Sequence, residues 1–313
     1  MADATLSCSV NSGEPASPAW SYAEAFSRHR GLVTEEEQYK LRCSRIAVAG
    51  MGGVGGVHLM TLARLGVGNF TVADADSFDV ANFSRQYGAT IATLGRNKAE
   101  VMAEMVEDVN PEARVKVLPE AVSPENVGHF LQGADVVIDG IDGYAIGARR
   151  LLFHEARRRG LWAITAGPIG FSVAWLSFSP HGMSFDEYFD LNDDMDYWDQ
   201  IVAFAVGMTP KATQRSYFDL ATMDPESKQG RTTGLACSLC AGVATAQALK
   251  IILGRGPLRP APWYGQFDAY QDTFRQGRLR WGNRHPLQRL RRWLVRRWLR
   301  SQLGMKSEVY RDR

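Results

Sequence analysis

Short apolar runs alternate with amphipathic segments along the first half of the chain. Five runs that predict β-strands begin near residues 45, 69, 113, 134 and 161, and segments with apolar residues at helical spacing lie between them. Strands separated by helices are typical of a parallel sheet that helices cover on both faces. We therefore predict an α/β protein with a doubly wound, mostly parallel, Rossmann-like sheet.

The pattern changes after Pro168. Residues 171–180 alternate like an antiparallel strand, and residues 263–281 resemble a closing pair of strands. Between them, residues 234–256 predict a long apolar helix that ends at glycine, while residues 181–233 are acidic and aromatic without a clear period. We expect residues 181–233 to form a lid or a substrate region.

The composition of the chain indicates its cellular context and the character of its N-terminal segment. The 313 residues carry a formal net charge of only +2 and four cysteines, too few for a disulfide scaffold. We see no secretory signal and no apolar stretch long enough to span a bilayer, which favours a cytoplasmic protein. Residues 1–19 are rich in Ser, Ala, Pro and Gly, and we predict a disordered tail there.

A glycine-rich turn follows the first predicted strand and opens a helix. In "AGMGGVGG" the residues Gly50, Gly52, Gly53 and Gly55 would let the backbone approach a phosphate closely, beside the positive end of the helix. Asp74 lies about 20 residues on, at the end of the second strand, where such folds hold a ribose hydroxyl. This fingerprint alone does not separate NAD, FAD and ATP.

Polar residues that follow Asp74 distinguish between these nucleotides. Asn82 and Arg85 come too early to lie on the next helix, so we place them on a loop at the carboxyl edge of the sheet, and Lys98 begins the helix that follows. Two cations converging on a phosphate site suit a triphosphate under attack, where charge builds up and pyrophosphate leaves. A hydride carrier has no need of them.

A carboxylate beyond the fourth predicted strand could hold magnesium. Asp142 in "VVIDGID" faces the same carboxyl edge, and one carboxylate with waters and phosphate oxygens can complete the shell of Mg²⁺. Asp139 could be the ligand instead, although it lies inside the strand pattern.

These motifs resemble those of the ubiquitin-activating-enzyme superfamily, in its bacterial ThiF/MoeB/HesA branch. The resemblance covers roughly residues 28–270. The segments that carry it are "GMGGVGG", "DADSFDVANFSRQ", "GRNKAE", "NPEARV", "VIDGID" and "AGVATAQALKIILG". It implies that Mg·ATP adenylates a carboxylate, giving an acyl-adenylate and pyrophosphate, and it makes residues 20–272 an ATP-binding adenylation domain.

The resemblance also implies roles for single residues. It places the glycine turn and Asp74 on the nucleotide, Asn82, Arg85 and Lys98 on the phosphates, and Asp142 on the metal. Members of the family are usually homodimers in which an arginine before the first strand reaches the partner's ATP. Arg28 or Arg30 in "FSRHRGL" is similar to that element, and the spacing leaves both open.

The sequence departs from the family pattern around its cysteines. Many members bind structural zinc through two CxxC pairs, whereas here only Cys237 and Cys240 form such a pair. We expect both thiols to be buried at the start of the long helix. A reactive thiol is the alternative, because a helix N-terminus lowers the pKa of a thiol.

Residues 273–313 are predicted to contain a strand and a basic amphipathic helix. In the segment 285–303 leucines and tryptophans recur at helical spacing among six arginines. Such a helix could lie on an anionic membrane such as the inner membrane surface, bind RNA phosphates, or dock on its own core or an acidic partner.

The best-supported hypothesis is ATP-dependent adenylation of a carboxylate. The acceptor could be the C-terminus of a ubiquitin-like or sulfur-carrier protein, a peptide, or a small metabolite. Within the superfamily, the alternative is a tRNA threonylcarbamoyladenosine dehydratase. Outside it, the alternatives are a NAD(P)- or FAD-dependent oxidoreductase and a non-catalytic scaffold with a degenerate site.

Overall fold

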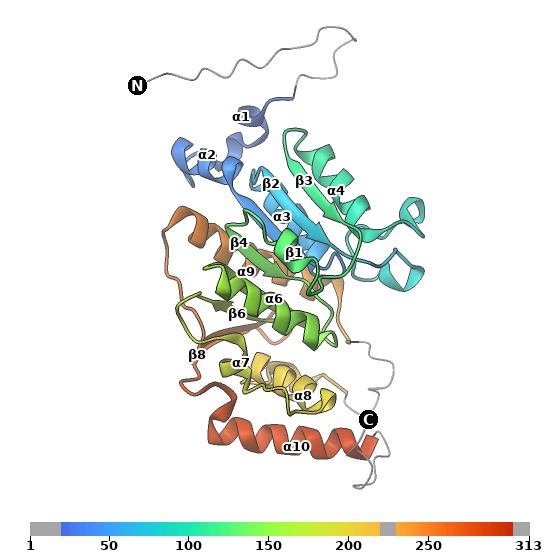
Figure 1. Ribbon diagram of the computed structural model, residues 1–313, viewed down its shortest axis with the longest axis vertical. Helices are drawn as coiled ribbons and strands as arrows, with labels where there is room; N and C mark the ends of the chain where they lie inside the picture. The colour runs from blue at the N-terminus through green and yellow to red at the C-terminus, as the bar shows by residue number, and fades with distance from the viewer. Residues whose placement is uncertain (1–19, 220–229, 303–313) are drawn as a thin grey trace.

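One eight-stranded sheet runs through the molecule. The computed structural model describes residues 20–219 and 230–302, and its sheet has the strand order β3-β2-β1-β4-β5-β6-β7-β8 (Figure 1). The first five of these strands are parallel, and each later strand is antiparallel to its neighbour. The prediction of a doubly wound, mostly parallel sheet with antiparallel C-terminal strands is therefore confirmed.

The parallel half contains the strands β1 (Arg45–Ala49), β2 (Asn69–Ala73), β3 (Arg114–Leu118), β4 (Val136–Asp139) and β5 (Trp162–Ile169). Its helices are α1 (Tyr22–Ala25), η1 (Ser27–His29), α2 (Glu35–Cys43), α3 (Gly55–Arg64), η2 (Val80–Asn82), η3 (Ile91–Thr93), α4 (Lys98–Val109), α5 (Val127–Phe130) and α6 (Ile146–Arg158).

Alternate residues of each central strand face two separate cores. Along β1, Ile46 and Val48 pack with α3, α4 and the long helix α9 (Gly234–Leu253), whereas Ala47 and Ala49 pack with α5 and α6. The period-2 alternation of a strand thus buries both of its faces, as in other sheets covered on both sides. The carboxyl ends of the parallel strands consequently meet along a single edge.

The antiparallel half is built from β6 (Ser172–Phe178), β7 (Trp263–Asp268) and β8 (Thr273–Arg278). β7 and β8 form a hairpin in which Asp268 pairs with Thr273. The domain boundary that we predicted at residue 272 falls inside this hairpin, and β8 continues the sheet of the preceding domain.

α9 precedes β7 in the chain and packs on α3 and on the strands β5 and β6. By length and mean hydropathy, which reaches 1.6, this helix would suffice to cross a membrane, so the expectation that no such stretch exists was wrong. Its buried residues Cys240, Ala244 and Ala248 pack in the same core as the central strands. α9 is thus a core helix of the sheet domain.

The segment predicted as a lid or substrate region contains three helices in its described part. It contains α7 (Phe185–Phe189), α8 (Tyr197–Met208) and η4 (Thr213–Ser216), while residues 220–229 lie outside the described residues. Past β8 follow η6 (Gly282–Arg284) and α10 (Pro286–Gln302). α10 lies along α8 on the outside of the molecule (Figure 1), so it docks on its own domain, one of the three alternatives for this helix.

Candidate active site

The glycine turn between β1 and α3 is shaped by contacts that exclude side chains. Gly50 has a positive φ of 85°, and a Cβ there would collide with the carbonyl group of Gly140, which follows β4. A Cβ on Gly55 would collide with the carbonyl oxygen of Gly50. Only glycine fits at these two positions, because the turn folds tightly against the neighbouring strand end. The turn therefore lies at the β1–β4 switch point, where open α/β sheets bind ligands.

Asp74 fixes the turn from the next strand. Its carboxylate accepts hydrogen bonds from the amides of Met51, at 2.6 Å, and Asp76, at 2.8 Å. Burial raises the pKa of Asp74, while these two amides and the nearby Lys98 oppose the shift. The predicted ribose ligand thus lies against the glycine turn.

Lys98 lies close to Asp74 at the start of α4. Its Nζ is 3.0 Å from Oδ2 of Asp76, and the lysine side chain is only 7% exposed while that of Asp76 is 73% exposed. Asn97 caps the helix and also donates to the carbonyl oxygen of Asp74. A buried ammonium beside an exposed carboxylate can exchange that partner for a phosphate oxygen.

Asn82 and Arg85 belong to one turn of the chain, which lies beside the glycine turn. The carbonyl of Asn82 accepts hydrogen bonds from the amides of Arg85 and Gln86, and its side chain accepts from the amide of Asp79. The aliphatic part of Arg85 lies beside Gly53, since a Cβ at position 53 would be 3.7 Å from its Cγ and Cδ. Arg85 therefore borders the glycine turn, and its role at a phosphate site stays a prediction.

The thiols of α9 approach the same turn from behind. Cys237 and Cys240 are buried, and a Cβ on Gly53 would be 3.1 Å from Sγ of Cys237. Burial raises the pKa of Cys237 although Arg85 opposes the shift, and burial raises the pKa of Cys240 further. These directions favour packing residues over a reactive thiolate.

Two carboxylates three residues apart have opposite environments. Asp139 is buried and forms a 2.7 Å ion pair with Nε of Arg149, whose side chain is only 4% exposed. Asp142 is exposed, and its Oδ1 accepts a hydrogen bond from the amide of Tyr144. Asp139 is thus committed to Arg149, whereas Asp142 leaves an oxygen available for a metal.

Arg149 also holds the loop that carries Asp142. Its two terminal nitrogens donate to the carbonyl oxygens of Ile141 and, at 3.4 Å, Gly143. Its guanidinium stacks on the ring of Phe204 from α8, 4.4 Å from the ring centroid. One side chain therefore joins the strand end, the loop and the covering helix.

The first turn of α8 lies over this loop. The hydroxyl of Tyr197 donates to the carbonyl oxygen of Tyr144 at 3.0 Å, and Trp198 packs edge-on against Tyr144. Burial, with a contribution from Asp142, raises the pKa of Tyr197. The acidic and aromatic segment thus covers one side of the site.

Arg28 and Arg30 do not join the glycine turn of their own chain. Both are exposed on or beside η1, and the neighbouring Tyr22 donates to the carbonyl oxygen of Gly66, just before β2 begins. This places the segment at the amino ends of the strands, the edge opposite the glycine turn.

Three contributors to the site were not among the predicted site residues. Gly140 directly follows the fourth strand, at the switch point. A small residue at that position was the signal that another backbone packs closely there. Asp76 lies within the quoted "DADSFDV" motif. Arg149 had no local signal, since Arg150 beside it looks the same but binds Asp186 of α7.

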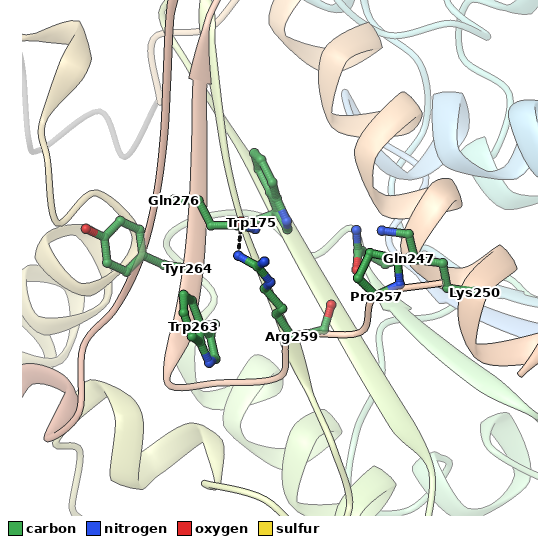
Figure 2. Close-up of a pocket in the computed structure, with 9 residues that line it drawn as sticks. Trp175, Gln247, Lys250, Pro257, Arg259, Trp263, Tyr264 and Gln276 are labelled. Carbon is green, nitrogen blue, oxygen red and sulfur yellow. Dashed lines mark hydrogen bonds between the residues drawn. The ribbon is translucent and has the colours of Figure 1, made fainter. Parts of the chain in front are cut away.

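A separate cavity lies at the far edge of the sheet (Figure 2). Trp175, Ser177, Lys250, Arg259 and Trp263 help to line it, and Arg259 lies between the two indoles and bonds to Gln276. Ser177 pairs with Ile164 near the start of β5, so this cavity is remote from the glycine turn.

Comparison with known proteins gives the family. Residues 26–289 match the ThiF family. The chain belongs to this family. The resemblance stated from the nucleotide motifs is thereby confirmed.

Known members of the ThiF family match this chain over different lengths. A tRNA threonylcarbamoyladenosine dehydratase of Haemophilus influenzae is 37% identical over 150 residues, 48% of this chain and 57% of that protein. The probable adenylyltransferase/sulfurtransferase MoeZ of Mycobacterium tuberculosis is 28% identical over 253 residues, 78% of this chain and 57% of that protein. The chain thus spans somewhat more than half the length of each.

Among solved structures, that of PaaA has the same fold. It superposes with a TM-score of 0.63 and 19% identity, over 84% of this chain and 86% of PaaA.

Proposed function

We propose that the protein uses ATP to adenylate a substrate carboxylate. The observation that carries the proposal is the ring of groups around the glycine turn: Arg85 beside Gly53, Lys98 beside Asp74, and Asp142 on the loop beyond Gly140. Two cations and a carboxylate fit a triphosphate and its metal. A hydride carrier would leave them without a purpose.

The residues divide the work of the reaction. The glycine turn and the start of α3 hold phosphate oxygens through backbone amides, and Asp74 orients the ribose. A carboxylate oxygen of the acceptor attacks the α-phosphorus, the bond to the oxygen bridging the β-phosphorus breaks, and pyrophosphate leaves. Arg85 and Lys98 stabilise the charge that develops on the transferring and leaving groups. No general base is required, because the nucleophile is already ionised.

Asp142 is the residue that would hold magnesium. It is exposed, and its second oxygen accepts no hydrogen bond from the described residues. Bound there, the ion would offset phosphate charge. Arg149 fixes the loop by its carbonyls, so only one oxygen of Asp142, which accepts from the amide of Tyr144, is used in holding the loop.

We assign α7 and α8 to the lid. α8 contacts the Asp142 loop through Tyr197 and Phe204, and such a cover would keep water from the acyl-adenylate.

We also propose a homodimer in which Arg28 or Arg30 serves the partner's site. Both arginines lie at the wrong edge to reach their own glycine turn. Leu235, Leu239 and Val243 recur every four residues along α9; Leu235 is 51% exposed and the other two are only partly buried, so this row offers a surface for a second copy.

The acceptor has two candidates of different chemistry. The length of the match to the MoeZ protein favours a carrier-protein or peptide C-terminus. The higher identity to the tRNA threonylcarbamoyladenosine dehydratase favours the carboxylate of a modified tRNA adenosine, which would cyclise after adenylation.

The test is ATP–pyrophosphate exchange, screened against carrier proteins, peptides and tRNA that carries threonylcarbamoyladenosine. We expect exchange with one acceptor class, and a loss of about 10²–10³-fold in Arg85→Ala and in Asp142→Ala. Arg96→Ala is the matched control, because Arg96 lies near the site but pairs with Glu104 at the surface. Near-normal exchange in either site variant would contradict the assigned role.

Mixing two inactive variants tests the arginine from the partner. A heterodimer of Arg30→Ala and Asp142→Ala keeps one complete site if Arg30 acts across the interface, so mixing should restore activity. No recovery for Arg30 or for the matching Arg28→Ala mixture would exclude action in trans.

A further inference from the structure

α10 keeps an apolar outer face although its inner face already packs on the molecule. On the inner face, Leu299 is buried and Val295 and Trp298 are half-buried against Val202 and Val206 of α8. Figure 1 shows α10 as the outermost element, with α8 between it and the sheet. Docking therefore explains only one side of this helix.

The opposite side exposes four large apolar residues. Leu287 is 59% exposed, Leu290 52%, Trp293 54% and Leu294 51%. Their spacing of three or four residues, together with the adjacent pair Trp293 and Leu294, places them along one side of a straight helix. Single exposed leucines are ordinary, but a row of four is typical of an interaction surface.

Two pairs among the six arginines of α10 differ in their partners, and Arg291 donates to the carbonyl oxygen of Pro210. Arg292 and Arg296 are bound to acidic residues of the domain, at 2.7 Å from Asp190 and 2.5 Å from Asp199. Arg289 and Arg297 flank the apolar row and have no acidic partner within the described residues. The guanidinium of Arg297 lies 5.7 Å from the centre of the Trp293 ring. The outer face therefore combines apolar side chains with positive charge left for an external partner.

We propose that the outer face of α10 binds the surface of an anionic membrane, with the helix lying in the plane of the interface. The leucines require an apolar environment, which acyl chains provide, while arginines and tryptophan suit the headgroup region. Phosphates of an RNA would satisfy Arg289 and Arg297 but would leave Leu287, Leu290 and Leu294 in water. The row of leucines therefore favours a lipid surface over an RNA.

Co-sedimentation of the full chain with vesicles tests this proposal. We expect binding to vesicles of phosphatidylcholine and phosphatidylglycerol in equal parts, and much weaker binding to phosphatidylcholine alone. Arg289→Gln/Arg297→Gln should weaken binding to the anionic vesicles roughly thirtyfold. Leu290→Ser/Trp293→Ser should abolish it, whereas Phe274→Ser, a control with a 55% exposed apolar residue on β8, should leave it unchanged.

Two outcomes would overturn the proposal. One is equal sedimentation of the wild type and the Leu290→Ser/Trp293→Ser variant. The other is tRNA binding that needs Arg289 and Arg297 but not the leucines, with no binding to vesicles. Pyrophosphate exchange is measured on the same variants and should stay at the wild-type level, so failure here is separate from failure of the adenylation proposal.

Discussion

The two halves of the sheet contribute differently to the site. In the parallel half, the glycine turn, Asp74 and the Asp142 loop follow strands at the carboxyl edge, so the topology brings these predicted ligands to one edge of the sheet. In the antiparallel half, the chain leaves the sheet between β6 and β7 and builds α7, α8 and α9. In this excursion, α8 contacts the Asp142 loop, and the first turn of α9 packs against the glycine turn.

The difference shows that few contacts join the predicted ligands of the parallel half to the helices α8 and α9 that cover them. Arg149 joins Asp139 and the Asp142 loop to Phe204 of α8, and Thr233 at the start of α9 donates to the carbonyl oxygen of Gly170. Substitutions at these contacts should affect both stability and the site, whereas substitutions inside one half should affect stability alone.

The largest effect is expected at Arg149. Arg149→Met leaves the buried carboxylate of Asp139 without its ion-pair partner, which should cost about 3–5 kcal/mol of unfolding free energy. Urea denaturation measures this loss. Because the Asp142 loop also loses its support, exchange activity should fall in the fraction that remains folded.

Two variants serve as controls for Arg149. Adding Asp139→Asn to Arg149→Met should recover much of the stability, since no buried charge remains. Arg158→Met removes an exposed pair with Glu155 on the same helix and should cost less than about 1 kcal/mol. Equal losses for Arg149→Met and Arg158→Met would contradict the role of Arg149.

His58 tests the core of the parallel half. Burial lowers the pKa of His58 to about 3, and neither ring nitrogen has a hydrogen-bond partner among the described residues. The folded-state pKa lies below the unfolded value of about 6.5. The free energy of unfolding is therefore at its full value above pH 6.5 and decreases as the pH falls toward 3. Between pH 7.5 and 5 this residue should cost about 2 kcal/mol.

The measurement is urea denaturation of the wild type and His58→Leu at both pH values. The difference between the two proteins should change by the amount expected for His58. A parallel pH dependence in both would show that His58 is not buried in its neutral form.

The smallest effect is expected at the helix cap of α9. Thr233 accepts a hydrogen bond from the amide of Ala236, and Thr233→Ala should cost about 1 kcal/mol. Thr34→Ala removes the equivalent cap of α2 and should cost a similar amount. A Cβ on Gly234, the first residue of α9, would be 3.1 Å from the carbonyl oxygen of Ser84 and 3.7 Å from Cα of Arg85, so Thr233→Ala alone should also weaken ATP binding. Equal ATP binding by both variants would contradict a contribution of α9 to the nucleotide site.

Local signals were enough to predict the parallel half. Apolar periodicity placed its five strands, and the position of Gly50, Asp74, Arg85 and Lys98 after strand ends indicated the crevice. The rest depends on contacts between distant segments. Nothing in residues 181–233 indicates that Phe204 would stack on Arg149, because that contact joins α6 to a helix 55 residues away in the chain.

The C-terminal helix shows the same limit. Its amphipathic pattern predicted a helix, but the pattern could not tell which of its apolar rows would be covered. Acidic residues of the excursion decide this, since Asp190 and Asp199 bind Arg292 and Arg296 and turn Leu287 and Leu290 outward.

Equilibrium binding of nucleotides tests the central claim most directly, because it requires no knowledge of the acceptor. Calorimetric titration should show that Mg·ATP binds the wild type, that NAD and NADH do not, and that Arg85→Gln weakens Mg·ATP at least about tenfold. Tight binding of NADH, or Mg·ATP binding that is unchanged in Arg85→Gln, would contradict a site built for a triphosphate.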